Sequence, residues 1–156
     1  MDNLLSLLKP KHATCVLHRD LTLRQAIEKI KASGLTAVPV IDDEGKYCGT
    51  VSEGDFLNVV IHEDQPKQWE KTKLISILRE GYNPPVNIMA SMDDLLMSAM
   101  EQNFVPVVDD RGAFIGIVTR RDIIRHFVEE RNAEAAKQAR LSRSGNDQAA
   151  ALYSCR

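Results

Sequence analysis

The spacing of hydrophobic residues predicts an amphipathic helix early in the chain. Four apolar residues recur at intervals of three and four and therefore share one helix face: Leu23, Ala26, Ile27 and Ile30. Thr22 stands just before this stripe and Gln25 follows Thr22 by three residues, which is the spacing of a capping box. Gly34 is suited to end the helix, because glycine adopts the left-handed backbone conformation at little cost.

Short apolar runs on either side of this helix predict strands. Residues 15–17 precede it, and residues 37–41 follow it as a buried strand. Pro39 within the second run lacks an N–H group, which favours a sheet edge or the start of a strand. A tight turn rich in aspartate then leads to a returning strand at residues 47–51, and a helix over residues 53–61 completes the unit.

This order of elements occurs twice in the chain. Residues 36–57 align without a gap with residues 103–124, after a shift of 67 positions. The identical positions include prolines, aspartates and glycines: Pro39 with Pro106, Asp42 and Asp43 with Asp109 and Asp110, Gly45 with Gly112, Gly49 with Gly116, and Asp55 with Asp122. A chance match between two cores would align apolar positions alone, so the chain holds two copies of one unit.

The second copy has its own helix stripe, which Ser91 is placed to cap, after a weak strand at residues 86–88: Met92, Leu95, Leu96, Ala99 and Met100. Neither copy alone could bury both faces of so small a sheet. We therefore expect an α+β fold in which the order strand, helix, strand, strand, helix occurs twice and the copies pack as one pseudo-two-fold module.

The duplication also predicts the boundaries. We expect the first repeat at residues 10–62 and the second at residues 85–130. Residues 63–84 are interpreted as a linker with one short helix, and residues 131–156 as a helical or frayed tail.

Charge and composition favour a cytoplasmic protein. A formal net charge of −2 gives no excess of basic residues for binding nucleic acid. No apolar run approaches the roughly 20 residues of a membrane-spanning helix, and the first residues do not resemble a signal peptide. Cys15, Cys48 and Cys155 are odd in number and widely spaced, which favours reduced thiols.

Both repeats end in a glycine, a hydroxyl residue and an aspartate at the same spacing. The first copy has Ser52 and Asp55, and the second has Thr119 and Asp122. The hydroxyl lies where strand gives way to helix, and free N–H groups and the helix dipole favour a phosphate there. The aspartate offers two acceptor oxygens for the vicinal hydroxyls of a ribose. A capping box explains a single such motif equally well.

The glycines of this motif, Gly49 and Gly116, would leave room for a ligand to approach the backbone. The pattern h-P-V-h-D-x-x-G-x-h-x-G-h-h-[ST]-x-x-D, where h is an apolar residue in every case but Thr50, occurs at residues 38–55 and again at residues 105–122. It resembles the CBS domain over about residues 10–130, and two copies resemble a CBS pair, or Bateman module. The resemblance implies a homodimer and an adenine nucleotide ligand: AMP, ADP, ATP, S-adenosylmethionine or a cyclic dinucleotide.

The resemblance also implies roles for particular residues. Asp55 and Asp122 would hold ribose hydroxyls, Ser52 and Thr119 would contact ribose or phosphate, and two strand segments would flank the base: Thr36, Ala37, Val38 and Pro39, and Phe104, Val105 and Pro106. The chain is also similar to small CBS-only proteins of Gram-positive bacteria that bind cyclic di-AMP. The similar segments are Lys11 to Ala13, residues 35–39, and Thr119 with Arg120 and Arg121.

The two sites are not expected to be equal. Arg120 and Arg121 place two cations at the start of the second helix, where they suit phosphates. Glu53 and Gly54 hold the matching positions in the first repeat, and Glu53 would repel an anion. We therefore expect the Thr119/Asp122 site to be the principal one, with Lys11 and Thr36 as contributors.

Catalytic chemistry is not indicated. The four histidines are scattered without a zinc-ligand spacing, and the chain has no Walker loop and no G-x-G-x-x-G motif. The paired aspartates resemble a metal site, but tight turns explain them. We therefore expect a non-catalytic regulatory module, without metal or catalytic cofactor, that binds an adenine nucleotide and signals to an unidentified protein partner through its dimer. The alternative is an interaction scaffold with vestigial pockets.

Overall fold

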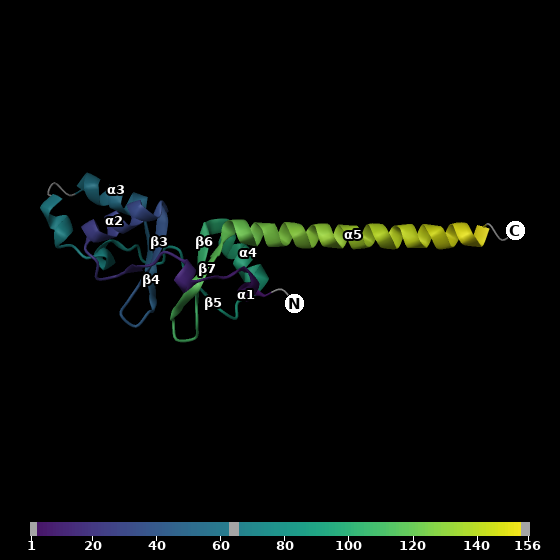
Figure 1. Ribbon diagram of the computed structural model, residues 1–156, viewed down its shortest axis with the longest axis horizontal. Helices are drawn as coiled ribbons and strands as arrows, with labels where there is room; N and C mark the ends of the chain where they lie inside the picture. The colour runs from purple at the N-terminus through teal and green to yellow at the C-terminus, as the bar shows by residue number, and fades with distance from the viewer. Residues whose placement is uncertain (1–2, 63–65, 154–156) are drawn as a thin grey trace.

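The computed structural model of the chain describes residues 3–62 and 66–153 (Figure 1). The beginning of the chain, part of the expected linker and Cys155 lie outside the described residues. Cys15 and Cys48 are free thiols in the described part.

The first repeat follows the predicted order of elements: β2 (Leu17–His18), α2 (Leu23–Ser33), β3 (Ala37–Ile41), β4 (Tyr47–Ser52) and α3 (Glu53–His62). The Thr22 hydroxyl accepts the N–H of Gln25 and the Gln25 side chain accepts the N–H of Thr22, so the predicted capping box is present. Gly34 ends α2 with φ 70°. In the sheet β2 is parallel and β4 antiparallel to β3.

The second repeat has the same order: β5 (Val86–Asn87), α4 (Met92–Glu101), β6 (Phe104–Val108), β7 (Phe114–Thr119) and α5 (Arg120–Tyr153). Ser91 caps α4 as expected, in a capping box with Asp94. The two prolines, Pro39 and Pro106, lie where β3 and β6 have a partner on one side alone, because β2 and β5 pair only further along these strands. Their missing N–H groups therefore cost no ladder hydrogen bond.

The segments before the two repeats contain elements that the hydrophobic pattern does not predict. The N-terminal segment holds α1 (Leu4–Leu7), β1 (Lys9–Pro10) and the 3₁₀ helix η1 (Lys11–Ala13). The linker holds two 3₁₀ helices, η2 (Pro66–Glu70) and η3 (Leu74–Ile77), where we expected one short helix.

The N-terminal segment, which precedes the first repeat, packs on the second repeat, and the linker, which precedes the second repeat, packs on the first. Strand β1 pairs antiparallel with β7, so residues that precede the first repeat extend the sheet of the second. A Cβ atom on Gly116 would lie 2.1 Å from the Lys9 carbonyl oxygen, and one on Gly49 would lie 3.5 Å from the Leu78 side chain. The expectation that these glycines leave room for a ligand is therefore wrong, because protein segments fill that space.

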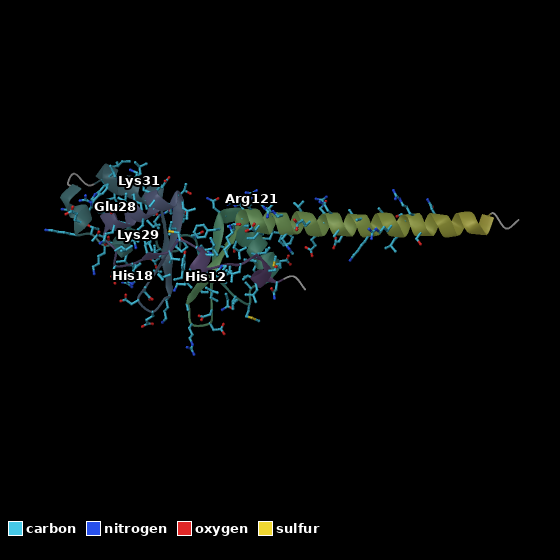
Figure 2. The ribbon with its side chains drawn as sticks, viewed as in Figure 1. His12, His18, Glu28, Lys29, Lys31 and Arg121 are labelled. Atoms are coloured by element: carbon cyan, nitrogen blue, oxygen red, sulfur yellow. The ribbon has the colours of Figure 1, made fainter. Side chains whose placement is uncertain are left out.

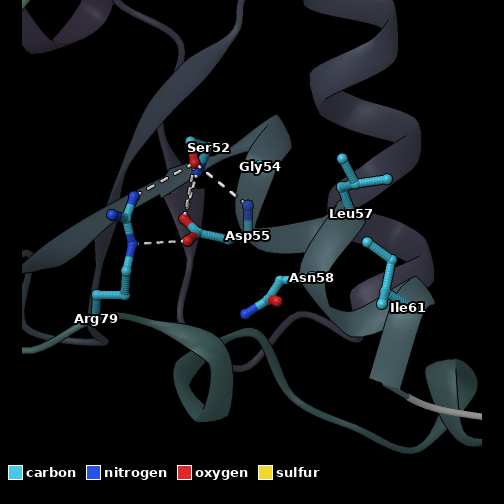
Figure 3. A pocket seen from close by; sticks show the side chains of 7 residues that line it. All are labelled: Ser52, Gly54, Asp55, Leu57, Asn58, Ile61 and Arg79. Carbon is cyan, nitrogen blue, oxygen red and sulfur yellow. Dashed lines mark hydrogen bonds and ion pairs between the residues drawn. The ribbon is translucent and has the colours of Figure 1, made fainter.

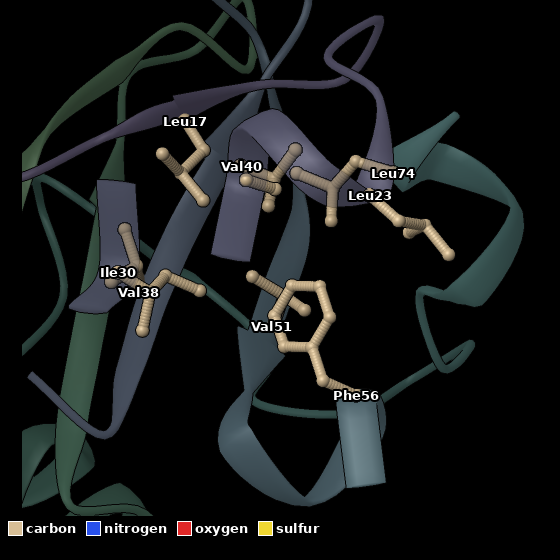
Figure 4. Close-up of a cluster of buried hydrophobic side chains, with 9 residues drawn as sticks. Leu17, Leu23, Ile30, Val38, Val40, Val51, Phe56 and Leu74 are labelled. Carbon is tan, nitrogen blue, oxygen red and sulfur yellow. The ribbon is translucent and has the colours of Figure 1, made fainter. Parts of the chain in front are cut away.

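Two separate hydrophobic clusters form the core, one in each repeat. The first contains Leu74 of the linker, and Figure 4 shows it between the strands and helices of the first repeat: Leu17, Leu23, Ile30, Val38, Val40, Val51, Phe56 and Leu74. The second contains Leu4 of the N-terminal segment together with residues of the second repeat: Leu95, Ala99, Val105, Val107, Val118 and Ile123. The core of the first repeat thus includes a residue of the linker, and the core of the second repeat includes a residue of the N-terminal segment.

Equivalent residues of the two repeats form contacts between the repeats. The N–H of Tyr47 donates to the Gly112 carbonyl at 3.1 Å, and the N–H of Phe114 donates to the Gly45 carbonyl at 2.9 Å. Replacing each residue of one bond by its equivalent in the other repeat, 67 positions away, gives the other bond. A pseudo-two-fold axis between the repeats requires this relation. The rings of Tyr47 and Phe114 stack with centroids 6.2 Å apart.

A buried polar network also joins the repeats. The Tyr47 hydroxyl lies 2.7 Å from both the Asn83 carbonyl and the Thr50 hydroxyl, and the Asn83 amide donates to Thr50 at 3.0 Å. Gln102 of the second repeat donates to the Asn83 side chain at 2.9 Å. Because the carbonyl can only accept, Tyr47 donates its single proton there and accepts from Thr50.

Helix α5 extends far beyond the body of the molecule (Figure 1). Its 34 residues correspond to a length of about 51 Å. The side chains at positions 129–146 are exposed. The segment expected to be a helical or frayed tail is helical as far as Tyr153. No helix among the described residues is long and apolar enough to span a bilayer.

Candidate functional site

The motif of the first repeat lies where β4 passes directly into α3. The Ser52 N–H and hydroxyl both donate to Oδ2 of Asp55, at 2.8 and 3.0 Å, and the Asp55 N–H donates to the Ser52 hydroxyl. This arrangement caps α3, so the structural role that a capping box implies is present. The Asp55 side chain is only 8% exposed.

The other oxygen of Asp55 binds an arginine from the linker. Nε of Arg79 lies 2.7 Å from Oδ1 of Asp55, and the same guanidinium donates to the Ser52 hydroxyl at 3.5 Å (Figure 3). The guanidinium also lies over the Tyr82 ring, 3.5 Å from its centroid. Arg79 thus joins the linker to the motif of the first repeat.

A cavity of about 360 Å³ opens beside this group, and seven residues line it: Ser52, Gly54, Asp55, Leu57, Asn58, Ile61 and Arg79. Arg79 is the one cationic residue of that lining. It therefore supplies the positive charge that Glu53 and Gly54 do not provide at the start of α3. The cavity combines a hydroxyl, a carboxylate, a guanidinium and an apolar wall.

The motif of the second repeat lies at the equivalent junction between β7 and α5. The Thr119 hydroxyl donates to Oδ2 of Asp122 at 2.7 Å, and the Asp122 N–H donates back at 3.2 Å. Oδ1 of Asp122 has a looser ionic partner than Oδ1 of Asp55, because Arg125 lies 3.8 Å away. A cavity of about 280 Å³ adjoins this carboxylate, lined by Ser6, Leu7, Asp122, Arg125, His126 and Glu129.

The two arginines expected to receive phosphates differ in position. Nε of Arg120 donates to the carbonyls of Ala99 and Gln102, at 2.7 and 3.0 Å, so this side chain caps the end of α4. Arg121 is exposed at the start of α5 (Figure 2). Only Arg121 thus remains fully accessible to an anion.

The remaining expected contacts lie on several elements. Lys11 and Ala13 are exposed on η1, and Thr36 is exposed just before β3, where its carbonyl accepts the N–H of Glu53. Ala37 is half-buried on β3. Within the described parts of the chain, the two cavities beside the aspartates are lined by residues other than these four.

The segments expected to flank a base lie on β3 and β6, the central strands of the sheets. The side chains of Val38 and Val105 are completely buried in the two hydrophobic clusters. Pro39 and Pro106 are buried as well, and Phe104 is partly exposed. These valines could contact a ligand only through their backbone.

One cluster with the composition of a metal site lies elsewhere. His18, Asp20 and Asp43 have ligand atoms within 4.8 Å of one another. Nδ1 of His18 accepts the N–H of Asp20 at 3.1 Å and Nε2 lies 2.6 Å from Asp43, so both ring nitrogens have partners. Asp42 accepts two backbone N–H groups of its turn, which lowers its carboxyl pKa, as expected for a structural turn.

Sequence reasoning did not identify Arg79 and Arg125. Arg79 lies outside the duplicated segment, in a linker without hydrophobic periodicity. It precedes β5 by seven residues, as Pro10 precedes β2, so it matches the segment in which Lys11 was singled out. Lys11, however, was singled out by the resemblance to CBS-only proteins, and no Lys-x-Ala segment occurs at Arg79, so that resemblance could not have identified it.

The comparison with protein families agrees with this architecture. The model of the CBS domain matches residues 13–62 and again residues 84–129. The chain therefore belongs to the CBS domain family and holds two copies of the domain. Among curated proteins it is 27% identical over 116 residues to an A-adding tRNA nucleotidyltransferase of Aquifex aeolicus. That match covers 74% of this chain but only 13% of the enzyme.

Solved structures share the fold. CbpB in complex with c-di-AMP aligns with a TM-score of 0.78 and 21% identity, over 87% of this chain and 91% of that chain. CBSX2 in complex with AMP aligns with a TM-score of 0.67 and 25% identity, over 84% of this chain and 99% of that chain. The described structure is thus a tandem CBS module.

Proposed function

We propose that this protein is a non-catalytic regulatory module that binds an adenine nucleotide between its elements at the starts of α3 and α5. The observation that carries the proposal is the duplicated pair of hydroxyl and carboxylate, Ser52 with Asp55 and Thr119 with Asp122, each beside a cavity. In each site the aspartate holds the vicinal ribose hydroxyls, and nearby cations bind the phosphates.

The ligand belongs to the adenylates. CbpB was solved with c-di-AMP and CBSX2 with AMP, and both share the fold of this chain. AMP, ADP and ATP carry both vicinal ribose hydroxyls and phosphate, whereas the 3′ oxygen of cyclic di-AMP is esterified, so the aspartate would hold only its 2′ hydroxyl. Arg121 is the exposed cation that we assign to phosphates of a ligand at the Thr119/Asp122 site, whereas Lys11 lies near the turn at Gly45 and outside the cavity beside Asp122.

Signalling proceeds through a homodimer. Leu57 and Ile61 on α3 and their equivalents on α5, Ile124 and Val128, are each at least half exposed. An apolar face present in both copies supports contact with a second copy of the chain, because exposed apolar surface favours association. Nucleotide binding then selects one arrangement of the dimer, which a partner protein distinguishes.

Isothermal titration of the purified protein tests this function. The wild type is titrated with AMP, ATP, S-adenosylmethionine and cyclic di-AMP, beside the matched variants Asp55→Asn and Asp122→Asn. Asparagine keeps one acceptor oxygen for the helix cap but loses the charge, so affinity at the altered site should fall about 10-fold or more.

The outcomes separate the two functions under consideration. An adenylate that binds the wild type and loses affinity in either variant supports a nucleotide sensor. Absence of binding by any of the four compounds would instead support the interaction scaffold, in which both aspartates serve only as helix caps.

A further inference from the structure

The first site is closed by the protein itself. Both oxygens of Asp55 are engaged, since Oδ2 accepts from Ser52 and Oδ1 lies 2.7 Å from Nε of Arg79. Oδ2 already accepts two hydrogen bonds from Ser52, so the vicinal hydroxyls of a ribose must bind through the lone pairs of Oδ1. A nucleotide can therefore occupy Asp55 in that manner only after Arg79 has moved away.

Arg79 is placed to make this movement. Its side chain is about half exposed at the edge of the cavity, whereas Asp55 is buried. Its stack on Tyr82 fixes the guanidinium on the open side of the carboxylate. Rotating this long side chain breaks the ion pair with Asp55, the contact with the Ser52 hydroxyl and the stack on Tyr82, and frees Oδ1 without a change in the backbone.

A displaced Arg79 still lies beside the ligand. It is the one cation among the residues that line this cavity, and Glu53 at the start of α3 opposes an anion there. A guanidinium binds phosphate oxygens through two parallel hydrogen bonds. The loss of the contact with Asp55 is then offset by a contact with the ligand, but only if the ligand carries a phosphate.

On the basis of the proposed function, we propose that Arg79 is the selectivity gate of the Ser52/Asp55 site. It occupies the ribose-binding carboxylate in the free protein and transfers to the phosphate of the bound nucleotide. Adenosine must displace Arg79 from Asp55 but has no phosphate to bind the displaced guanidinium, so the site rejects adenosine. AMP supplies that phosphate, so the site accepts AMP.

The test compares adenosine with AMP in a protein whose second site is disabled by Asp122→Asn. In that background, Arg79→Ala should bind adenosine more tightly, because the competing guanidinium is gone. It should bind AMP more weakly, because the phosphate loses its partner. The ratio of AMP affinity to adenosine affinity should fall by about 10-fold or more.

Two further variants control the comparison. Arg79→Gln keeps the length of the side chain without its charge and should lower the ratio in the same direction, which covers the case in which Arg79→Ala is poorly folded. Arg143→Ala removes an exposed arginine on the outer part of α5, away from both cavities, and should leave the ratio unchanged.

The results distinguish the inference from the function on which it rests. A ratio that stays the same in Arg79→Ala and Arg79→Gln, while adenylates still bind, overturns the gate and leaves the nucleotide site intact. Failure of AMP and adenosine to bind any of these proteins overturns the gate alone, whereas the proposed function is overturned only if the wild type, with both sites intact, binds none of the four compounds.

Discussion

At the scale of single residues, Tyr47 occupies an unusual position for a tyrosine. Its hydroxyl is part of the buried network with Thr50 and Asn83, at the place where the repeats meet. Burial raises the pKa of Tyr47 from 10.0 to about 12, although its two hydrogen bonds act in the opposite direction. The fold therefore holds this phenol in its neutral form.

The sign of this shift predicts a loss of stability in alkali. Because the pKa in the folded state lies above that in the unfolded state, the stabilising contribution is complete below pH 10 and is lost as pH rises from 10 to about 12. A shift of this size corresponds to roughly 3 kcal/mol. Denaturant unfolding across this range should show the decline in wild type and a smaller one in Tyr47→Phe.

The same variant should be less stable at neutral pH. It leaves the Asn83 carbonyl and the Thr50 hydroxyl one partner short in a buried place, which costs about 1–3 kcal/mol. Equal stability of Tyr47→Phe and wild type at neutral pH would contradict the network.

At the scale of elements, β1 is the least expected feature. It has only two residues, and its register with β7 places Pro10 opposite Gly116. The hypothetical Cβ of Gly116 would lie 2.1 Å from the Lys9 carbonyl oxygen. No rotation of a side chain relieves contact with a backbone atom, so glycine is required there.

Gly116→Ala should therefore separate β1 from β7 and destabilise the protein by about 2 kcal/mol or more, measured by denaturant unfolding. Gly145→Ala is the matched control, because nothing lies within 4 Å of that position on the exposed part of α5. It should be neutral or stabilise by up to about 1 kcal/mol. Similar losses for both variants would contradict the assigned register.

These elements also show what could be predicted from the sequence. The capping box at Thr22, the cap at Ser91 and the strands around Pro39 and Pro106 were predictable, because local periodicity and turn chemistry determine them. Strand β1 was not, since two residues carry no period. The contact of Arg79 with Asp55 was not predicted either, because it depends on how the linker packs across the first repeat.

The position of Arg120 illustrates the same limit at a charged residue. Its place in the motif indicated a phosphate ligand, whereas its side chain reaches back to the carbonyl groups at the end of α4. The direction of a long side chain depends on the nearest acceptors, and these come from an element 20 residues away in the chain.

At the scale of the whole molecule, the equivalent apolar positions of α3 and α5 form the surface that we assign to the homodimer. Ile124 and Val128 lie on α5 close to the body of the molecule, before the exposed extension of the helix begins. An interface is weakened strongly when charges are placed at its buried centre.

The wild type should sediment as a dimer, and the double variant Ile124→Asp/Val128→Asp should sediment as a monomer. Leu141→Asp is the control, since Leu141 is exposed on the outer part of α5 and should leave the dimer intact. Circular dichroism confirms that each variant is folded. A dimer that persists in the double variant would locate the interface elsewhere.

The pairing of β1 with β7 has a consequence for how the chain acquires its fold. Lys9 lies opposite Ile117, so a segment made before both repeats finds its strand partner only when most of the second repeat has been made. Leu4 likewise packs into a core that the second repeat forms, and the core of the first repeat is complete only after Leu74 has been made. Pairings so distant along the chain slow folding, because a long loop must close first. The residues of β1 are therefore synthesised before both repeats and are among the last to reach their native position.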